Sequence, residues 1–478
     1  ACVAIRNPAC QSDRVGRVRF ATPSEIEAAL QAAIKAGADW GAGETDRRAL
    51  CLERAAQGIE AHTHALAALL VREAGKTFPA ALGEVREAAD YCRYYASRLR
   101  AGDVVGSTPL GPIVAISPWN FPLAIFVGQV AAALAAGNPV IAKPAEQTPL
   151  IADRAVALFH DAGVPPPVLQ CLPGEGDVGA TLVADERVQG VLFTGSTTVA
   201  GAIHRQLAGR GSVRLVAETG GINAMIVDST ALPEQVVGDV LASAFDSAGQ
   251  RCSALRLLCI QDEIADRVLS LLDGAMAELR VGLPEDFSTD VGPVIDLSAR
   301  LRIDAYVDAM RADHRRVLTR SLPDECSQGS FVAPTLIEIP SPEDLCQEVF
   351  GPVLHVVRYA STALDTILDA ISAQGYGLTL GIQSRIDDFV HHVIGRMKVG
   401  NIYVNRSMVG AVVGVQPFGG EGLSGTGPKA GGPLYLLRLL SQRPADALAR
   451  TFAEADRFSP SDTERRERLL APLTTLEQ

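Results

Sequence analysis

GPIVAISPWNFPLAIFVGQVAAALAAGNPVIAKP, residues 111–144, decides the fold class, because it places one long apolar run between two short ones. The short runs, Ile113–Ile116 and residues 139–144, are bounded by proline or glycine, and each predicts a buried strand. The long run at 121–137 is interrupted by a proline and a glutamine. It therefore predicts a buried helix rather than a membrane span.

Strand and helix patterns continue to alternate after this stretch. Strands are expected at 168–174, 190–195 and 213–220, and helices at 148–162, 177–184 and 197–208. A second series, from Asn223 to about Phe418, contains expected strands at 223–229, 255–261 and 400–405 and a helix at 232–245. Such alternation is typical of βαβ units in a parallel, doubly wound sheet. We therefore expect an α/β protein with two α/β layers and a cleft between them.

The first third of the chain has helical periodicity instead. Ser24 and Glu27 match a capping box, and apolar residues follow at helical spacing. Residues 46–100 continue this pattern. We therefore expect amphipathic helices before the first strand of the sheet.

The composition is that of a globular enzyme. The 478 residues, of which 47% are hydrophobic and 21% charged, are enough for two or three domains. The net charge of -12, without a basic cluster, argues against a nucleic-acid partner. Nine cysteines without a paired spacing argue against a disulfide framework and a metal site. No export signal is present, so we expect a cytoplasmic protein; the opening Ala1 suggests a fragment or a processed product.

Three residues suggest covalent chemistry. Cys252, in DSAGQRCSALRLL (246–258), follows small residues whose backbone N–H groups can lie near the sulfur, as a reactive thiolate requires. Glu218 ends an apolar strand beside two glycines, where a half-buried carboxylate can act as a base. Asn120 lies between two prolines, where a rigid amide can donate to an oxyanion. An inert thiol, a solvated glutamate and a turn asparagine remain the alternatives.

Other residues suggest a nucleotide. Gly195 and Ser196 open a helix after a buried strand, where free N–H groups can hold a pyrophosphate, although Ser196 as a simple cap explains the pattern equally well. Lys143 and Glu146 follow a strand, where they can share the hydroxyls of a ribose or form an ordinary salt bridge. A dinucleotide fingerprint lacks its distal acidic residue, and a second match has no following helix; these glycines are Gly174, Gly176 and Gly179, and Gly420, Gly422 and Gly425.

The order of these residues resembles that of the NAD(P)-dependent aldehyde dehydrogenase superfamily. The stretches that carry the resemblance are SPWNFP, KPAEQTP, FTGST, ETGG, GQRCS, EVFGP and PFGG, between residues 117 and 420. Longer stretches, including VNRSMVGAVVGVQPFGGEGLSGTGPKAGGPLYLLRLL, resemble the glutamate semialdehyde dehydrogenase module of bacterial proline utilization A proteins over nearly the whole chain. In that family an FAD-dependent proline dehydrogenase domain precedes this module.

The resemblance implies a fold and a domain order. We expect a Rossmann-type NAD-binding domain at 1–221, a catalytic α/β domain at 222–425 and a C-terminal helical segment or linker at 426–478. The active site would lie in the cleft between the first two. A short remnant of the family's oligomerisation hairpin is expected near 98–111, which leaves a homo-oligomer possible. A bacterial cytoplasmic location is implied.

The resemblance also implies a reaction and its residues. L-glutamate γ-semialdehyde, in equilibrium with 1-pyrroline-5-carboxylate, would be oxidised to L-glutamate with NAD, and no metal is expected. The implied catalytic residues are Cys252, Glu218 and Asn120. The implied cofactor-binding residues are Ile116, Trp119, Lys143, Glu146, Gly195, Ser196, Gly220, Glu348 and Phe350, of which Glu146 would disfavour NADP. The implied substrate-binding residues are Ser253, Gly410, Ala411, Phe121, Phe418 and Glu87.

Three other functions remain open from the sequence. A dehydrogenase of another ω-semialdehyde, such as succinate semialdehyde, would use a basic side chain to bind the far carboxylate. A cofactor-free cysteine hydrolase would need a histidine partner, and none of the eight histidines lies in a recognisable motif. A docking module without chemistry would not need Cys252, Glu218 and Asn120.

Overall fold

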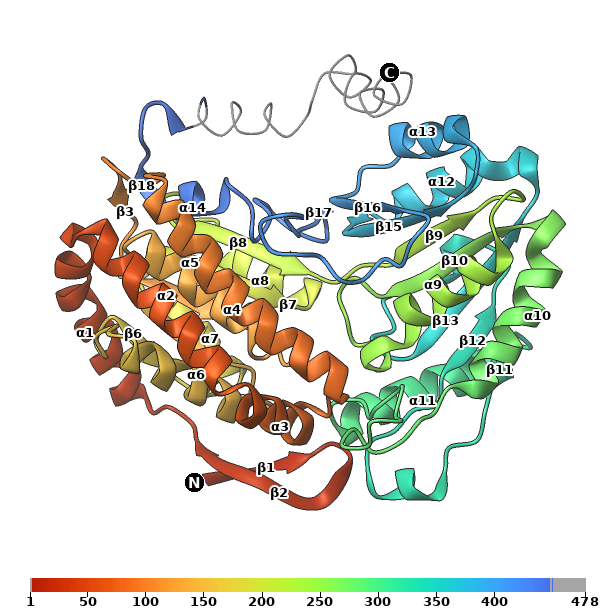
Figure 1. Ribbon diagram of the computed structural model, residues 1–478, viewed down its shortest axis with the longest axis horizontal. Coiled ribbons are helices and arrows are strands. Elements are labelled where there is room, and N and C mark those ends of the chain that lie inside the picture. Colours follow the sequence, from red (N-terminus) through yellow and green to blue (C-terminus); the bar gives the residue numbers. More distant parts are fainter. Residues whose placement is uncertain (1, 448, 450–478) are drawn as a thin grey trace, which may run out of the picture.

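The computed structural model describes residues 2–447 and 449, and it divides them between two α/β halves (Figure 1). The first half holds a parallel sheet in the order β6-β5-β4-β7-β8. Its strands are β4 (Ile113–Ile116), β5 (Val140–Lys143), β6 (Leu169–Cys171), β7 (Gly190–Gly195) and β8 (Arg214–Thr219). The order reverses between β4 and β7, which is the switch point where doubly wound sheets bind ligands. The predicted fold class is confirmed.

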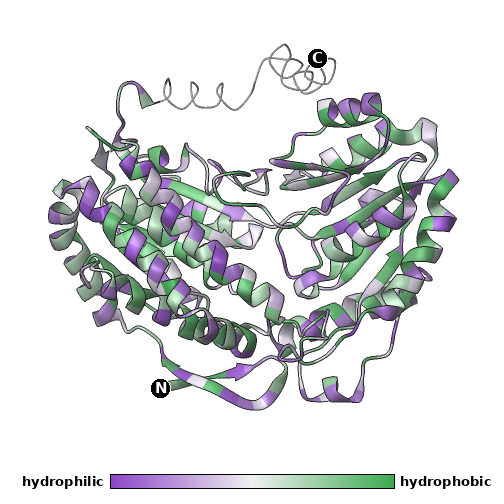
Figure 2. Cartoon of the chain, in the orientation of Figure 1, coloured by the Kyte–Doolittle hydropathy of each residue, from purple (hydrophilic) through white to green (hydrophobic). Residues whose placement is uncertain are grey.

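Helices cover both faces of this sheet, because strand side chains alternate between two apolar clusters. Ile113 and Ala115 face one cluster and Val114 faces the other. The first cluster takes in α2 (Thr45–Ala61), α3 (Thr63–Ala74), α4 (Phe78–Arg100), α5 (Ala124–Ala135) and α6 (Pro149–Asp161). The second takes in α1 (Pro23–Ala42), α7 (Gly176–Ala184) and α8 (Thr197–Leu207). Figure 2 shows hydrophobic residues gathered on the strands and the helix faces toward them.

The helix α5 is the predicted buried helix, and all but one of its residues are buried. Its apolar surface is covered mainly by α4 and α2. Among the described residues, no helix is both long and apolar enough to cross a membrane.

The second half holds a seven-stranded sheet in the order β11-β12-β13-β10-β9-β15-β16, parallel except for β11. The strands are β9 (Asn223–Val227), β10 (Leu255–Gln261), β11 (Arg316–Thr319), β12 (Thr335–Glu338), β13 (Val353–Tyr359), β15 (Thr379–Gln383) and β16 (Asn401–Val404). The helices are α9 (Pro233–Phe245), α10 (Asp262–Glu278), α11 (Leu297–Ala312), α12 (Leu364–Ala373) and α13 (Asp387–Arg396). Its central strands are continuous apolar runs because both faces are buried.

The beginning of the chain differs from the prediction. It starts with a hairpin of β1 (Cys2–Asn7) and β2 (Cys10–Arg19), which helical periodicity did not indicate. The predicted capping box of Ser24 and Glu27 is wrong: Thr22 and Glu25 form it. Pro23 is the reason, because its fixed φ suits the first helical position and makes the preceding residue the N-cap.

The segment at 98–111 does not form a hairpin within itself. The helix α4 continues to Arg100, since its buried face extends to Leu99. The short strand β3 (Thr108–Pro109) then pairs with β18 (Leu440–Gln442), far away in sequence. Residues 426–447 contain α14 (Tyr435–Arg438) and β18, and most of the expected linker lies outside the described residues.

Candidate active site

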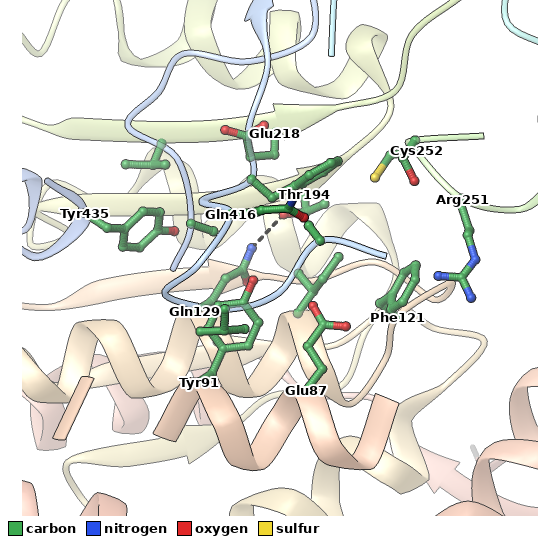
Figure 3. Close-up of a pocket in the computed structure, with 18 of the residues that line it drawn as sticks. Glu87, Tyr91, Phe121, Gln129, Thr194, Glu218, Arg251, Cys252, Gln416 and Tyr435 are labelled. Carbon is green, nitrogen blue, oxygen red and sulfur yellow. Dashed lines mark hydrogen bonds between the residues drawn. The ribbon is translucent and has the colours of Figure 1, made fainter. Parts of the chain in front are cut away.

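A pocket between the two halves brings together side chains from many elements (Figure 3). It contains Cys252, Glu218 and all six predicted substrate residues. It also contains residues that sequence analysis missed. The predicted members are Glu87, Phe121, Glu218, Cys252, Ser253, Gly410, Ala411 and Phe418, and the missed ones include Tyr91, Gln129, Thr194, Arg251, Gln416 and Tyr435.

The turn that presents Cys252 has an unusual backbone. The 3-10 segment η1 (Asp246–Gly249) contains Ser247, Ala248 and Gly249 with φ of 54°, 55° and 67°. Left-handed conformations in residues other than glycine are strained, so neighbouring groups must hold the turn. Gln250 does so: its Nε2 donates to the carbonyls of Ser247 and Pro293 at 3.2 Å, and its Oε1 accepts an N–H at 2.8 Å.

The half-buried thiol of Cys252 is not ionised at neutral pH. Burial raises the pKa of Cys252 to about 12, and the negative charges of Glu348 and Glu218 add to this effect. Desolvation outweighs the nearby N–H groups and favours the neutral thiol over the thiolate. The sulfur needs a base before it can act as a nucleophile.

The Asn120 amide lies against the turn at 246–252 that presents Cys252, here called the nucleophile turn. Its Nδ2 donates to the carbonyl of Gln250, two residues before Cys252, at 3.0 Å. Asn120 follows β4, so it comes from the carboxyl edge of the first sheet while Cys252 comes from the second half. The structure thus brings together two candidates that are 132 positions apart in sequence.

The Glu218 carboxylate lies in a cradle of glycines. Its Oε2 accepts the N–H of Gly420 at 2.9 Å, and its Oε1 is buried without a partner. A Cβ at Gly419 or Gly425 would come within 3 Å of the carboxylate. Burial raises the pKa of Glu218 to about 8, against the lowering effects of the Gly420 N–H and the positive charge of Lys429.

The loop that contains Gly420, Gly422 and Gly425 was not expected to bind phosphate, because no helix pattern follows it. Gly419 and Gly425 instead let the backbone of this loop approach the Glu218 carboxylate closely. The PFGG stretch was the available signal for it.

The nucleotide candidates lie along the carboxyl edge of the first sheet. Ile116 ends β4 opposite Lys143 of β5, and Gly195 ends β7 on the other side. The buried Lys143 has its Nζ 3.8 Å from the carboxylate of Glu146. A Cβ at Gly179 would lie 3.5 Å from Lys143 Cδ, so the weak fingerprint does pack beside these residues. Ser196 caps α8 and accepts a backbone N–H at 3.3 Å.

The remaining cofactor candidates form a cluster beside the nucleophile turn. Trp119 and Phe350 contact edge to face, with ring centroids 5.5 Å apart. Glu348 is ion-paired with Arg256 at 3.1 Å, and Gly220 leaves no room for a Cβ beside the Glu348 carboxylate. Sequence analysis missed Arg256, which looks like an ordinary strand residue within LRLLCIQ.

Two cationic side chains lie near the ring of Phe121, which lines the pocket. Lys76 Nζ lies 4.3 Å from the centre of the Phe121 ring, and the Arg251 guanidinium carbon lies 5.2 Å from it. Burial raises the pKa of Glu87 to about 7, and the positive charges of Arg251 and Lys76 oppose this effect. Glu84 pairs with Lys76 at 2.8 Å and accepts the first N–H groups of α5, which fixes the loop that carries Phe121.

Residues 1–443 match the model of the aldehyde dehydrogenase family. The chain belongs to this family. The match covers nearly the full length of the chain and includes the catalytic candidates Cys252, Glu218 and Asn120. The resemblance inferred from the sequence is confirmed.

This chain matches relatives of two size classes. It is 58% identical over 484 residues to the bifunctional protein PutA of Klebsiella aerogenes, covering 99% of this chain and 37% of that protein. It thus spans little more than a third of the PutA relatives that it matches. It is also 37% identical over 452 residues to the 1-pyrroline-5-carboxylate dehydrogenase of a Geobacillus species, covering 90% of this chain and 87% of that one.

Solved structures show the same two classes. A crystal structure of a bifunctional proline utilization A protein is 52% identical, with a TM-score of 0.87, covering 89% of this chain and 45% of that one. The 1-pyrroline-5-carboxylate dehydrogenase from Thermus with bound NAD is 36% identical, with a TM-score of 0.87, covering 93% of this chain and 89% of that one. The aldehyde dehydrogenase fold of this chain is confirmed.

Proposed function

We propose that this chain oxidises L-glutamate γ-semialdehyde, formed from 1-pyrroline-5-carboxylate, to L-glutamate with NAD. The observation that carries the proposal is one pocket that holds Cys252 and Glu218 together with the candidate groups for an amino-acid head. The names of the relatives and the Thermus neighbour with NAD support the same substrate and cofactor.

In the first step, Cys252 Sγ gives its proton to a hydroxide ion or buffer base from solvent and attacks the aldehyde carbon. The carbonyl oxygen becomes an oxyanion, which the backbone N–H of Cys252 and the Asn120 amide stabilise. Asn120 Nδ2 carries two hydrogens, and Gln250 takes only one in the described contacts, so one remains for the oxyanion. The product of this step is a thiohemiacetal on Cys252.

In the last step, Glu218 removes a proton from water, which attacks the thioester left after oxidation. The carbon–sulfur bond breaks, the thiol of Cys252 re-forms and the carboxylate product leaves. The unpartnered Oε1 atom of Glu218 can accept this proton. Its raised pKa makes it a stronger base than an ordinary carboxylate.

The residues at the sheet edge fit NAD. Lys143 and Glu146 offer a donor and an acceptor for ribose hydroxyls, and the start of α8 at Gly195 and Ser196 offers N–H groups for phosphate. Glu348 offers a second carboxylate for the ribose near the nicotinamide. When bound, NAD supplies the hydride acceptor. We assign supporting contacts with it to Ile116, Trp119, Gly220 and Phe350.

The six predicted substrate residues would bind the head and the aliphatic part of the substrate. Ser253 and the N–H groups near Gly410 and Ala411 provide donors for the α-carboxylate. Phe121 and Phe418 would pack on the aliphatic part, and Glu87 would lie at the entrance. These six residues line the pocket with Cys252.

One observation favours a second candidate, a dehydrogenase of succinate semialdehyde. Arg251 lines the pocket and is the kind of basic side chain that such a substrate would use. Its guanidinium is already paired with Asp246 at 2.7 Å, which weakens this alternative. A cysteine hydrolase is disfavoured, because no histidine is among the pocket-lining residues of the described chain.

The test follows NADH formation by absorbance with NAD and either 1-pyrroline-5-carboxylate or succinate semialdehyde. Cys252→Ala is the inactive variant, and Cys346→Ala, which changes an exposed thiol, is its matched control. We expect rapid NADH formation with the first substrate, lost in Cys252→Ala and kept in Cys346→Ala. Faster turnover of succinate semialdehyde, or no NADH from folded protein, would overturn the proposal.

We further propose the context of this module. Since the PutA relatives are named bifunctional and are much longer, an FAD-dependent proline dehydrogenase domain of the same polypeptide would supply the substrate in the bacterial cytoplasm. We place the boundary between the NAD-binding and catalytic domains near residue 221, between β8 and β9. A homo-oligomer is an assembly that the resemblance leaves open. Mixing the chain with a proline dehydrogenase, proline and NAD should give NADH.

A further inference from the structure

Arg256 is a fully buried arginine at the start of β10, between the nucleophile turn and the loop that carries Glu348. It lies at an irregularity in the pairing of β10 with β9, where the register shifts between Leu255 and Leu257. A regular strand would place successive side chains on opposite faces of the sheet. Leu255 pairs with Asn223, the first residue of β9, so Arg256 lies at the amino end of the sheet beside the loops that precede β9 and β13.

The Arg256 guanidinium contacts two loops at once. On the nucleophile side, Nη1 donates to the carbonyl of Gly249 at 2.7 Å and Nη2 to the carbonyl of Arg251 at 3.1 Å. On the other side, Nη1 donates to the carbonyl of Gly351 at 3.2 Å and Nη2 to Glu348 Oε1 at 3.1 Å. Its carbon lies 5.1 Å from the centre of the Phe350 ring.

The turn that presents Cys252 needs an external restraint. The nucleophile side contains the left-handed residues Ser247, Ala248 and Gly249, which relax unless neighbouring groups hold them. The two backbones also approach so closely that a Cβ at Gly249 would collide with the carbonyl of Gly351. A small movement of either loop would therefore change the placement of Cys252 relative to the Glu348 carboxylate.

We propose that Arg256 is a positioning residue that fixes the nucleophile turn of Cys252 against the loop of Glu348 and Phe350. Its kinetic consequence rests on the proposed function, whereas the restraint itself rests on the contacts alone. Burying a charge is costly, and an apolar side chain of similar volume often packs as stably. The gain is geometric, since a planar guanidinium can donate to four acceptors in fixed directions and a lysine cannot.

Arg48 provides a matched control. It is also buried and donates to four backbone carbonyls, those of Ala135, Trp40, Gly41 and Gly43, but it lies between α1, α2 and α5, away from the pocket. Arg48→Met thus removes a buried arginine of the same kind without touching either loop. Arg256→Met and Arg256→Lys are compared with it.

The experiment uses hydrogen exchange, NAD binding and turnover on the same preparations. Peptides covering 246–255 and 347–352 report the two loops. Trp119, which contacts Phe350, reports NAD binding by fluorescence, with the buried Trp40 as the only other tryptophan. In Arg256→Met we expect faster exchange in both peptides, weaker NAD binding and lower kcat, each by about tenfold or more.

The conservative variant separates the two contacts. Arg256→Lys keeps a positive charge for Glu348, so NAD binding should recover to near that of the wild type. A single ammonium cannot restrain both loops, so fast exchange and low kcat should remain. Arg48→Met should lower the melting temperature and leave exchange in both peptides, NAD binding and kcat unchanged.

Two outcomes would overturn the proposal. In the first, folded Arg256→Met shows wild-type exchange in both loops. In the second, Arg48→Met reproduces the effects of Arg256→Met, which would make the role merely structural. If the wild-type chain gives no NADH with 1-pyrroline-5-carboxylate, the proposed function fails, yet the exchange data still decide the role of Arg256.

Discussion

The pH dependence of turnover tests whether Glu218 is the general base. The carboxyl group ends β8, where one oxygen accepts the N–H of Gly420 and the other has no partner in the described chain. Burial raises the pKa of Glu218 from 4.5 to about 8. Because a general base acts only when ionised, turnover should rise with pH up to and through this value.

The size of the effect follows from the pKa. With a pKa of about 8, about one tenth of Glu218 is ionised at pH 7 and about nine tenths at pH 9. When thioester hydrolysis limits the reaction, kcat should therefore rise by about tenfold over this range and then level off. Glu218→Gln should lower kcat by about 10²–10⁴ and abolish the rise. It should still release one NADH per chain, because oxidation precedes hydrolysis.

A second variant shifts the pKa without removing the base. The positive charge of Lys429 lowers the pKa of Glu218 against the effect of burial. Lys429→Met should therefore move the midpoint of the pH profile upward. Lys35→Met, on the exposed side of α1, removes an equal charge far from the pocket and should leave the midpoint unchanged.

Stopped-flow absorbance of NADH between pH 6 and pH 10 measures the burst and the steady state together. Thermal unfolding of each variant shows whether it is folded. The reasoning is refuted if Glu218→Gln keeps wild-type turnover with the same pH rise, or if Lys429→Met shifts the profile no further than Lys35→Met does.

Other changes test separate parts of the molecule. Thr22→Ala removes the N-cap of α1 and should lower the free energy of unfolding by about 1 kcal/mol, whereas Ser24→Ala should change it little; urea unfolding compares the two. Gly220→Ala would push a Cβ against the Glu348 carboxylate, so the KM for NAD should rise by about tenfold, and an unchanged KM would contradict the placement of Glu348. Glu146→Ser removes a negative charge near the proposed ribose site, so the ratio of kcat/KM for NADP to that for NAD should increase.

The sequence predicted the first sheet well because its strands are buried on both faces. Runs such as Ile113–Ile116 stand between proline and glycine, and the helices between them are longer and periodic. The hairpin of β1 and β2 was missed, because its ten-residue second strand is rich in arginine and only half-buried. The two-residue strand β3 exists only through its pairing with β18, more than 300 positions away, which no local pattern indicates.

For the site, the order of residues along the chain predicted which of them act together, but it did not predict their contacts. Cys252 and Glu218 were predicted to act together, and both line one pocket. The acidity of each group depends on burial, which is a property of the folded chain. The glycine cradle around Glu218 forms because a loop 202 positions later in sequence returns to β8. Arg256 was missed for the same reason, since its four acceptors meet only after folding.

A comparison of two buried carboxyl groups shows why a raised pKa does not identify a catalytic residue. Burial raises the pKa of both Glu73 and Glu218 to about 8. Both oxygens of Glu73 accept N–H groups at the start of α6, from Leu150 at 2.7 Å and Ile151 at 2.9 Å, so that carboxyl group holds a helix in place. Glu218 keeps one oxygen without a partner and lines the pocket that contains the thiol. Its unpartnered oxygen in the pocket, together with its raised pKa, supports its proposed role as the base for water.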